Sequence, residues 1–423
     1  MNQRIHRYLI WQHRWTGLLM AVFLAVVGIT GSLLVYAPEI ERVINPQFFA
    51  KPRPGVPRLS LGEIAECVES QEPQIRVGYF FNSLPDTVLV RIGPRKNPLT
   101  GKPYDLPFDH VFVDPWSGKI LARRGGVSLS QGKANLMPFV RYIHTDLAMG
   151  EWGGLVLGYV ALVWTLDCFV GFYLTMPIGS RDFWRRWRVA WWVKFRANSF
   201  RINFDLHRAG GLWFWPLLLV LAWSSVYFEL MNVYERVMKA TVPYETFAEF
   251  DGKLAPHHPI EHPKLTWREA EVQSMKLLQQ EAAKRHFRIL RPALLAYIEP
   301  FGVYSYGVQS SLDTRANNPD TGLYLDGNTG EIRHLFLPNA VPIGNRFTNL
   351  INGLHFGDFR AWEAYRFLEF VTGLVICLLS VTGVYIWWKK RSIRRRRHTG
   401  RFGPGPEKFG DSAPVLPHGA ASA

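Results

Sequence analysis

Four long apolar stretches alternate with long polar segments along the 423-residue chain. Each stretch approaches or exceeds the ~20 residues that an α-helix needs to cross a bilayer. The stretches run over about 15–37, 153–176, 210–228 and 367–388. Tryptophan and tyrosine gather at their ends, as is typical of side chains at membrane–water interfaces. The pattern therefore predicts four membrane-spanning helices.

The first stretch also resembles a secretory signal peptide, because basic residues precede it. Its apolar run is longer than the ~7–15 residues of a signal-peptide core. In addition, Pro38 follows the one plausible cleavage site. We therefore predict a helix that is retained in the mature protein.

The charged residues predict the orientation of these helices. Lysine and arginine gather before the first stretch, between the second and third, and after the fourth, whereas the segments at about 38–151 and 229–366 have nearly balanced charge. Because cytoplasmic segments of membrane proteins are enriched in basic residues, both termini are predicted to be cytoplasmic. The long segments would then face the periplasm, and the protein would lie in a bacterial inner membrane. The net charge of +15 is therefore explained by contact with an anionic lipid surface and not by binding to nucleic acid.

The composition also excludes several kinds of redox and catalytic site. The three cysteines form no CxxC pair, which argues against a disulfide scaffold, a zinc site, a c-type haem attachment and a thiolate-held iron–sulfur cluster. The chain has no Rossmann glycine fingerprint and no P-loop, and it has no serine nucleophile elbow. A nicotinamide or flavin would therefore be used by another protein, or a membrane quinol would donate the electrons.

The two halves of the chain repeat each other. The motif HRWTGL at 13–18 recurs as HRAGGL at 207–212. Further on, Ser60 and Thr266 each begin a capping box with a glutamate three residues later, which predicts short amphipathic helices over about 61–70 and 267–283. The segments VDPWSGKI and LDGNTGEI then predict two strand–turn–strand hairpins.

This repeat predicts an α-helical membrane protein with a four-helix transmembrane bundle and two extracytoplasmic α+β domains in tandem. Each half begins and ends on the same side of the membrane, so the repeat is a parallel one. The expected segments are the N-terminus with the first span (1–37), the first outer domain (38–143), the second span (144–176), a basic cytoplasmic loop (177–206), the third span (207–229), the second outer domain (230–354), the fourth span (355–388), and a basic, then disordered, cytoplasmic tail (389–423).

Four histidines occupy equivalent positions in this repeat. His13 and His207 lie at the cytoplasmic ends of the first and third spans, and His144 and His355 lie at the outer ends of the second and fourth. A single histidine at the end of a membrane-spanning helix is ordinarily a residue of the membrane–water interface and not a metal ligand. Two imidazoles on facing helices of a bundle can, however, hold a haem iron from both sides. The topology therefore pairs His13 with His207 and His144 with His355, as axial ligands of one haem near each membrane surface.

Three residues near these histidines have alternative interpretations. Arg14 and Arg208 each follow a predicted ligand. They could pair with haem propionates, or they could simply be part of the positive charge on the cytoplasmic side. His6 lies seven residues before His13, on about the same helical face, and is an alternative ligand or a supporting group.

Other polar candidates are less specific. Asp167 lies inside the second span, where an acid is either functional, for example in a proton path, or is held neutral by hydrogen bonds within the bundle. A proline-rich outer segment contains a local cluster that could bind a metal or could be a solvated loop: His257, His258 and His262.

Taken in order, these motifs resemble a known family. The segment HRWTGLLMAVFLAVVGITGSLLVY, the two hairpin motifs, LHFG before the last span and the terminal TGVYIWWKKR are similar to the PepSY-associated transmembrane proteins of bacterial iron uptake. The resemblance extends to about residue 395. It implies an inner-membrane ferrisiderophore reductase with two b-type haems, the ligands His13, His144, His207 and His355, and outer domains that face the ferric substrate.

We therefore expect an oxidoreductase that takes electrons from a cytoplasmic or quinol donor and reduces the Fe(III) of a siderophore in the periplasm. Reduction helps to release iron because hard oxygen ligands suit Fe(III) better than Fe(II). Two alternatives remain. One is a quinol-linked cytochrome that passes electrons to a periplasmic protein, and the other is a non-enzymatic membrane component that binds or transports a siderophore.

Overall fold

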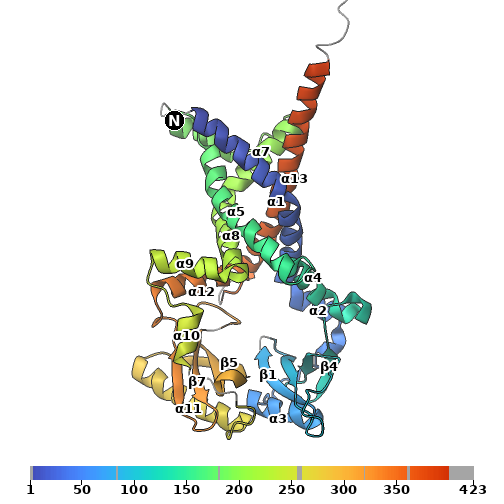
Figure 1. Ribbon diagram of the computed structural model, residues 1–423, viewed down its shortest axis with the longest axis vertical. Coiled ribbons are helices and arrows are strands. Elements are labelled where there is room, and N and C mark those ends of the chain that lie inside the picture. The colour runs from blue at the N-terminus through green and yellow to red at the C-terminus, as the bar shows by residue number, and fades with distance from the viewer. Residues whose placement is uncertain are drawn as a thin grey trace, which may run out of the picture.

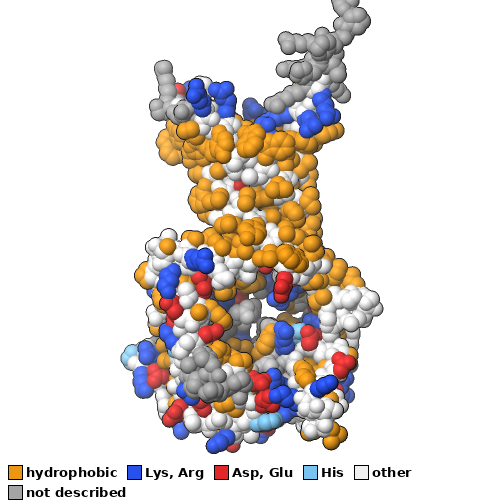
Figure 2. All heavy atoms as spheres, viewed as in Figure 1, with side chains coloured by type: hydrophobic (Ala, Val, Ile, Leu, Met, Phe, Trp, Pro, Cys, Tyr) orange, Lys and Arg blue, Asp and Glu red, His pale blue; other side chains and the backbone are white. Residues whose placement is uncertain are grey.

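The computed structural model describes residues 3–81, 84–179, 182–254, 260–318, 320–359 and 363–399. A column of helices stands on an antiparallel β-sheet (Figure 1). The start of the first helix and the end of the last lie at the end of the column that is far from the sheet. Figure 2 shows hydrophobic side chains around the column, with lysine and arginine gathered at the same far end.

Among the described residues, three helices of the column are long and apolar enough to cross a membrane: α1 (Gln3–Val35), α5 (Glu151–Thr175) and α13 (Glu363–Thr399). The third predicted span, 207–229, is not one straight helix. It is divided between α7 (Ser199–Trp213) and α8 (Trp215–Glu229), which meet at 70°. Pro216 stands at the second position of α8. Its ring has no N–H and clashes with the preceding turn, which breaks the helix at this point.

The histidine segments provide a second correction. His144 and His355 were expected within spans that begin at 144 and 355. They instead lie in the last turns of two separate short helices, α4 (Leu136–Asp146) and α12 (Ile343–His355). After α4 the backbone turns through Leu147 and Ala148, both in the left-handed region, before α5 begins. The predicted spans thus begin later than the histidines that precede them.

Small residues bring α1 and α13 into backbone contact. A Cβ added to Gly28 would lie 2.6 Å from the carbonyl oxygen of Gly373, and a Cβ on Gly373 would lie 2.5 Å from the carbonyl oxygen of Gly28. Ser32 donates a 2.9 Å hydrogen bond across the same crossing to the carbonyl oxygen of Phe370. Close backbone approach at glycine and serine is typical of packed membrane helices.

The sheet is continuous through both halves of the chain. Its strand order is β4-β3-β2-β1-β5-β6-β7-β8. The strands are β1 (Ile75–Phe81), β2 (Val88–Pro94), β3 (His110–Val113), β4 (Ile120–Arg124), β5 (Ile289–Ile298), β6 (Val303–Ser310), β7 (Thr321–Asp326) and β8 (Ile332–Phe336). Each half is a four-stranded antiparallel meander, and the halves join where β1 pairs with β5. The expected outer domains therefore share one sheet, because pairing covers two strand edges that would otherwise be exposed.

Local signals in this region are confirmed. Both capping boxes form, at Ser60 before α3 (Leu61–Gln71) and at Thr266 before α11 (Trp267–Arg285). The two helices pack against a shared core with one face of the sheet. Glu271 of α11 accepts hydrogen bonds from the first backbone N–H groups of α3, which ties the two halves together. The remaining α-helices are α2 (Ala37–Ile44), α6 (Phe183–Trp187), α9 (Met231–Thr241) and α10 (Phe247–Lys253).

Candidate functional site

The predicted histidines meet as two pairs. In the first pair, the rings of His13 on α1 and His207 on α7 have their centroids 6.2 Å apart, at 61° to each other. In the second pair, the rings of His144 on α4 and His355 on α12 are 6.5 Å apart, at 72°. Both pairings agree with those predicted from the repeat.

Neighbouring helices hold each ring of the first pair through its Nδ1 atom. Nδ1 of His13 lies 2.8 Å from a carboxylate oxygen of Asp167 on α5. Nδ1 of His207 lies 3.0 Å from the carbonyl oxygen of Leu379 and 3.1 Å from the hydroxyl of Thr382, both on α13. The first pair therefore lies among α1, α5, α7 and α13.

The second pair is held by two hydroxyl groups that correspond in the repeat. Nδ1 of His144 lies 3.0 Å from Oγ1 of Thr30, and Nδ1 of His355 lies 2.7 Å from Oγ of Ser224. Thr30 follows His13 by 17 positions, and Ser224 follows His207 by the same number. At 1.5 Å per residue, 17 residues of α1 span about 25 Å, so the two pairs lie near opposite ends of this helix.

The hydrogen bonds also determine which nitrogen of each ring carries a proton. The hydroxyl groups of Thr30, Ser224 and Thr382 each donate to a carbonyl oxygen of their own helix, at 2.8, 2.7 and 2.7 Å. A hydroxyl has one proton to donate, so the histidine Nδ1–H is the donor to each of them. Asp167 and the carbonyl of Leu379 are acceptors as well. All four rings thus keep the Nε2 lone pair for a ligand, and no group in the described part of the chain hydrogen-bonds Nε2.

Glycines leave room beside the rings. A Cβ added to Gly31, Gly171 or Gly383 would lie 3.0, 3.5 or 3.2 Å from Cε1 of the neighbouring histidine. One helical turn after His13 and His207, added Cβ atoms on Gly17 and Gly211 would have no heavy atom within 4 Å. The space one turn away from the first pair is therefore open. The His13 side chain is accordingly 32% exposed, whereas its partner Asp167 is 7% exposed.

The spacing within each pair is compatible with one metal ion between two imidazoles. Metal–imidazole bonds are about 2 Å long for zinc, and each ring centre lies about 1 Å beyond its nitrogen, so two rings in line with one metal have centres about 6 Å apart. No group of three or more His, Cys, Asp and Glu residues that could hold a metal is found among the described residues. A metal at either pair would therefore take its other ligands from a non-protein group. The residues present fit a haem held by two axial imidazoles.

The other predicted site residues have different surroundings. Arg208 donates 2.9 Å hydrogen bonds to Asp205 and to a backbone carbonyl, while its buried Nε has no hydrogen-bond partner. Arg14 is half-buried on α1, beside His13. His6 does not join either pair, and its ring lies 6.5 Å from that of Tyr173. In the predicted metal cluster, His257 and His258 lie outside the described residues.

Sequence reasoning missed the partners of the four histidines. It singled out Asp167 but not its bond to His13, and it did not consider Thr30, Ser224 or Thr382. One signal was present, since Thr30 and Ser224 are hydroxyl residues at the same spacing from a repeated histidine motif. Asp167 also lies one turn before Gly171, the residue that borders the same ring.

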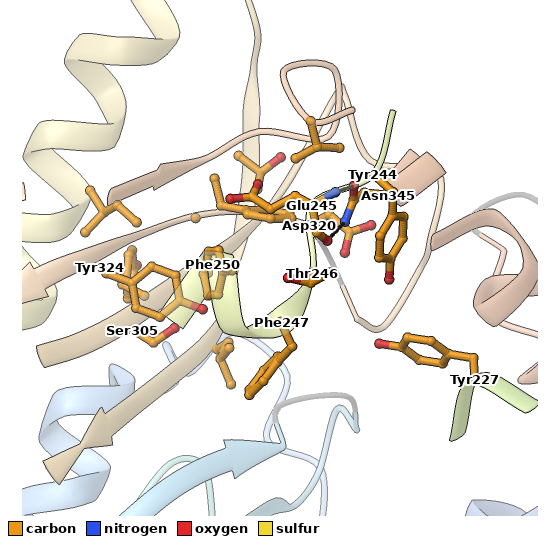
Figure 3. Close-up of a pocket in the computed structure, with 18 of the residues that line it drawn as sticks. Tyr227, Tyr244, Glu245, Thr246, Phe247, Phe250, Ser305, Asp320, Tyr324 and Asn345 are labelled. Atoms are coloured by element: carbon orange, nitrogen blue, oxygen red, sulfur yellow. Dashed lines mark hydrogen bonds between the residues drawn. The ribbon is translucent and has the colours of Figure 1, made fainter. Parts of the chain in front are cut away.

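A cavity of about 320 Å³ lies between the end of α8 and the sheet (Figure 3). Tyr227 at the end of α8 lines it, and the next residue, Phe228, has its ring 5.2 Å from that of His355. The opposite wall is formed by β5, β6 and β7, with α10 alongside. A second cavity of about 580 Å³ shares Tyr244, Glu245 and Val341 with the first.

The cavity is aromatic and acidic. Its carboxylates are Glu235, Glu245 and Asp320, and the described residues that line it include no lysine or arginine. Glu245 and Asp320 pair with Lys253 and Arg315, whereas Glu235 accepts a 2.7 Å hydrogen bond from a backbone N–H. Burial raises the pKa of Asp320, against the attraction of Arg315.

The fold and site define a multi-span membrane protein with an extramembrane antiparallel sheet and two histidine pairs inside an apolar column. The sequence matches the family described as PepSY-associated TM region over residues 10–390. The chain therefore belongs to this family, as its motifs predicted. No curated protein matches the sequence.

Proposed function

We propose that this protein is a transmembrane electron carrier with two b-type haems that reduces Fe(III)-siderophore on the periplasmic side of the bacterial inner membrane. The observation that carries the proposal is the pairing of four Nδ1–H histidines at ring distances of 6.2 and 6.5 Å, with Nε2 available in each. His13 and His207 would hold one haem, and His144 and His355 the other.

The proposed topology treats the bent α7–α8 pair as one span, which gives a four-helix bundle. Lysine and arginine gather at the end of the column that is far from the sheet, and this supports a cytoplasmic location for both termini (Figure 2). The sheet then faces the periplasm. The first histidine pair lies toward the cytoplasmic surface and the second toward the periplasm.

We also propose that the halves are a tandem repeat of one PepSY-like unit. The mirror-related strand order about β1 and β5 supports this, as do the two capping boxes. The matched hydroxyl partners of His144 and His355 extend the correspondence into the membrane.

The protein residues would bind, orient and insulate the cofactors. A b-type haem, when bound, supplies a one-electron couple whose potential depends on its axial ligands and surroundings. The Nδ1 hydrogen bonds orient the four rings and increase the basicity of Nε2. Arg208, whose buried Nε has no hydrogen-bond partner, would pair with a propionate near the first pair. Apolar helices separate the sites from bulk water.

We place the ferric substrate in the cavity beside the second pair. Its size lies at the lower end of the range for ligand pockets, so it would hold part of a chelate and leave the remainder in the adjoining larger cavity. The donor on the other side of the membrane would be a cytoplasmic reductase or a quinol.

The test is reconstitution of the purified full-length holoprotein into liposomes with a reductant trapped on the side of the first pair. A membrane-impermeant ferric siderophore outside should be reduced at a rate that falls at least tenfold in His355→Ala. His262→Ala, which changes a histidine outside both pairs, serves as the matched control and should retain the rate. Bound haems without reduction of any ferric chelate would favour the cytochrome that serves a periplasmic protein. A colourless protein would favour a siderophore-binding component.

A further inference from the structure

The four histidines differ in the charge of the group that holds them. Three of the rings donate to neutral oxygens, from Thr30, Ser224 and the Leu379–Thr382 pair. His13 alone donates to a carboxylate, that of Asp167, at 2.8 Å. The first pair is therefore the one in which a side-chain acid directly contacts a predicted ligand.

The surroundings of Asp167 suit an anion. The residue is 6% exposed within the apolar column. Besides the bond from His13, its other carboxylate oxygen accepts a 3.3 Å hydrogen bond from the Nε2 amide of Gln12. The hydroxyl of Thr16 lies 3.2 Å from the same oxygen, but its proton is donated to the carbonyl oxygen of Gln12 at 3.0 Å. A buried carboxylate is stabilised by hydrogen bonds such as those from His13 and Gln12.

The repeat shows that the fold does not require this acid. Asp167 precedes Gly171 by four residues, and Gly171 borders the ring of His13. In the other half, Leu379 precedes Gly383 by four residues, and Gly383 borders the ring of His207. The backbone carbonyl of Leu379 therefore orients the ring of His207, whereas the carboxylate of Asp167 orients the ring of His13. Of these two equivalent positions, only the one at Asp167 carries a charged side chain.

A carboxylate that accepts a hydrogen bond from Nδ1–H makes an axial imidazole a stronger donor and would stabilise the more positive ferric state of a bound haem. We propose that Asp167 is a positioning residue that gives the first site a lower reduction potential than the second, so that electron transfer across the bundle is downhill toward the sheet. One electron leaves the first site, which is oxidised, and enters the second, which is reduced. This inference rests on the proposed function.

Other charges act on both sites, but in the described part of the chain none of them is hydrogen-bonded to one of the four paired histidines. Arg14 and Arg208 lie near the first pair, and Arg208 is already paired with Asp205. Near the second pair, Arg141 is one turn before His144. Glu369 lies 3.3 Å from the hydroxyl of Tyr365, and no hydrogen bond joins it to a histidine among the described residues. The pairing of Arg208 with Asp205 offsets its charge, whereas Asp167 contacts a ligand ring directly.

The experiment is a spectroelectrochemical titration of the full-length holoprotein in detergent. Wild type should show two one-electron midpoints. Asp167→Asn should raise the lower one so that the equilibrium constant between the sites changes at least tenfold, which corresponds to about 59 mV. Asp167→Glu should retain most of the wild-type separation. The matched control is Glu369→Gln, which removes an equally buried acid and should leave the lower midpoint unchanged.

The same substitution in a His355→Ala background assigns the midpoint, because that protein keeps the first site alone. Unchanged midpoints in Asp167→Asn, or a shift of the higher one only, would overturn the inference while leaving two haems in place. Loss of the first haem in both the Asn and Glu variants would also overturn it, because Asp167 would then act only as a mechanical support. Wild-type protein without a b-type spectrum would instead refute the proposed function itself.

Discussion

Gly31 on α1 provides a sharp test of the space beside the second histidine pair. A Cβ at this position would lie 3.0 Å from Cε1 of His144, whereas ordinary contacts are 3.4–4 Å. In Gly31→Ala the ring must therefore move by a few tenths of an ångström, away from its 3.0 Å hydrogen bond with Thr30. Overpacking costs about 1–3 kcal/mol.

Alanine also favours a helix over glycine by about 0.8–1.0 kcal/mol, which offsets part of this cost for the fold as a whole. The ring displacement acts locally, so we expect haem binding at the second site to weaken by about 5–150-fold, the equivalent of 1–3 kcal/mol. The control is Gly252→Ala in α10, where a Cβ meets no atom within 4 Å. This variant should bind haem like the wild type.

The assay is haem content per chain by pyridine haemochrome, on proteins purified without added haem. Gly31→Ala should fall from two haems toward one and should regain the second when haem is supplied in excess. Two haems with an unchanged reduced spectrum in Gly31→Ala would refute the reasoning. An equal loss in Gly252→Ala would show that the effect is general instability.

Three further predictions concern packing, pH and the cavity. Gly28→Leu should force α1 and α13 apart at their glycine crossing and lower the thermal midpoint in detergent by several degrees, while Gly252→Leu should not. Burial raises the pKa of Asp326, but hydrogen bonds from Arg333 and from two backbone N–H groups hold it below its ordinary value. The ionised Asp326 thus stabilises the fold above the ordinary aspartate pKa of ~3.9, and this contribution is lost as the pH falls further. Asp326→Asn should therefore flatten the acid limb of a curve of unfolding free energy against pH. An unchanged acid limb would contradict this prediction. Glu235→Gln should weaken binding of a cationic gallium(III) chelate by about two- to fivefold, the equivalent of up to ~1 kcal/mol, as measured by tryptophan fluorescence, and equal binding would exclude Glu235 from the site.

The parts of the fold that could be predicted depend on local patterns. The capping boxes at Ser60 and Thr266 and the hairpin turns at Asp114 and Asp326 are set by residues a few positions apart, and the structure contains each of them. The apolar lengths of α1, α5 and α13 likewise follow from the thickness of a bilayer.

The errors concern features that depend on distant parts of the chain. A window of apolar residues does not reveal that Pro216 bends the third span by 70°. The joining of two meanders through β1 and β5 is a contact between strands more than 200 residues apart. The separate helices whose last turns contain His144 and His355 depend on backbone turns for which the sequence gives weak signals.

The candidate site was predictable in part for the same reason. The repeat made the four histidines stand out, and it predicted their pairing. Their partners could not be predicted, because the bond between His13 and Asp167 joins two helices whose rotation about their axes is set by packing. The glycines at 31, 171 and 383 were visible in the sequence, but the ring that each one borders was not.

The central claim is that each histidine pair binds one haem. Haem stoichiometry of the purified full-length protein and of His13→Ala, His207→Ala, His144→Ala and His355→Ala tests it most directly. We predict two low-spin b-type haems per chain in the wild type and one in each variant, with His13→Ala and His207→Ala retaining the same haem and His144→Ala and His355→Ala retaining the other. A colourless wild type, or single variants that keep two haems with unaltered spectra, would contradict the claim.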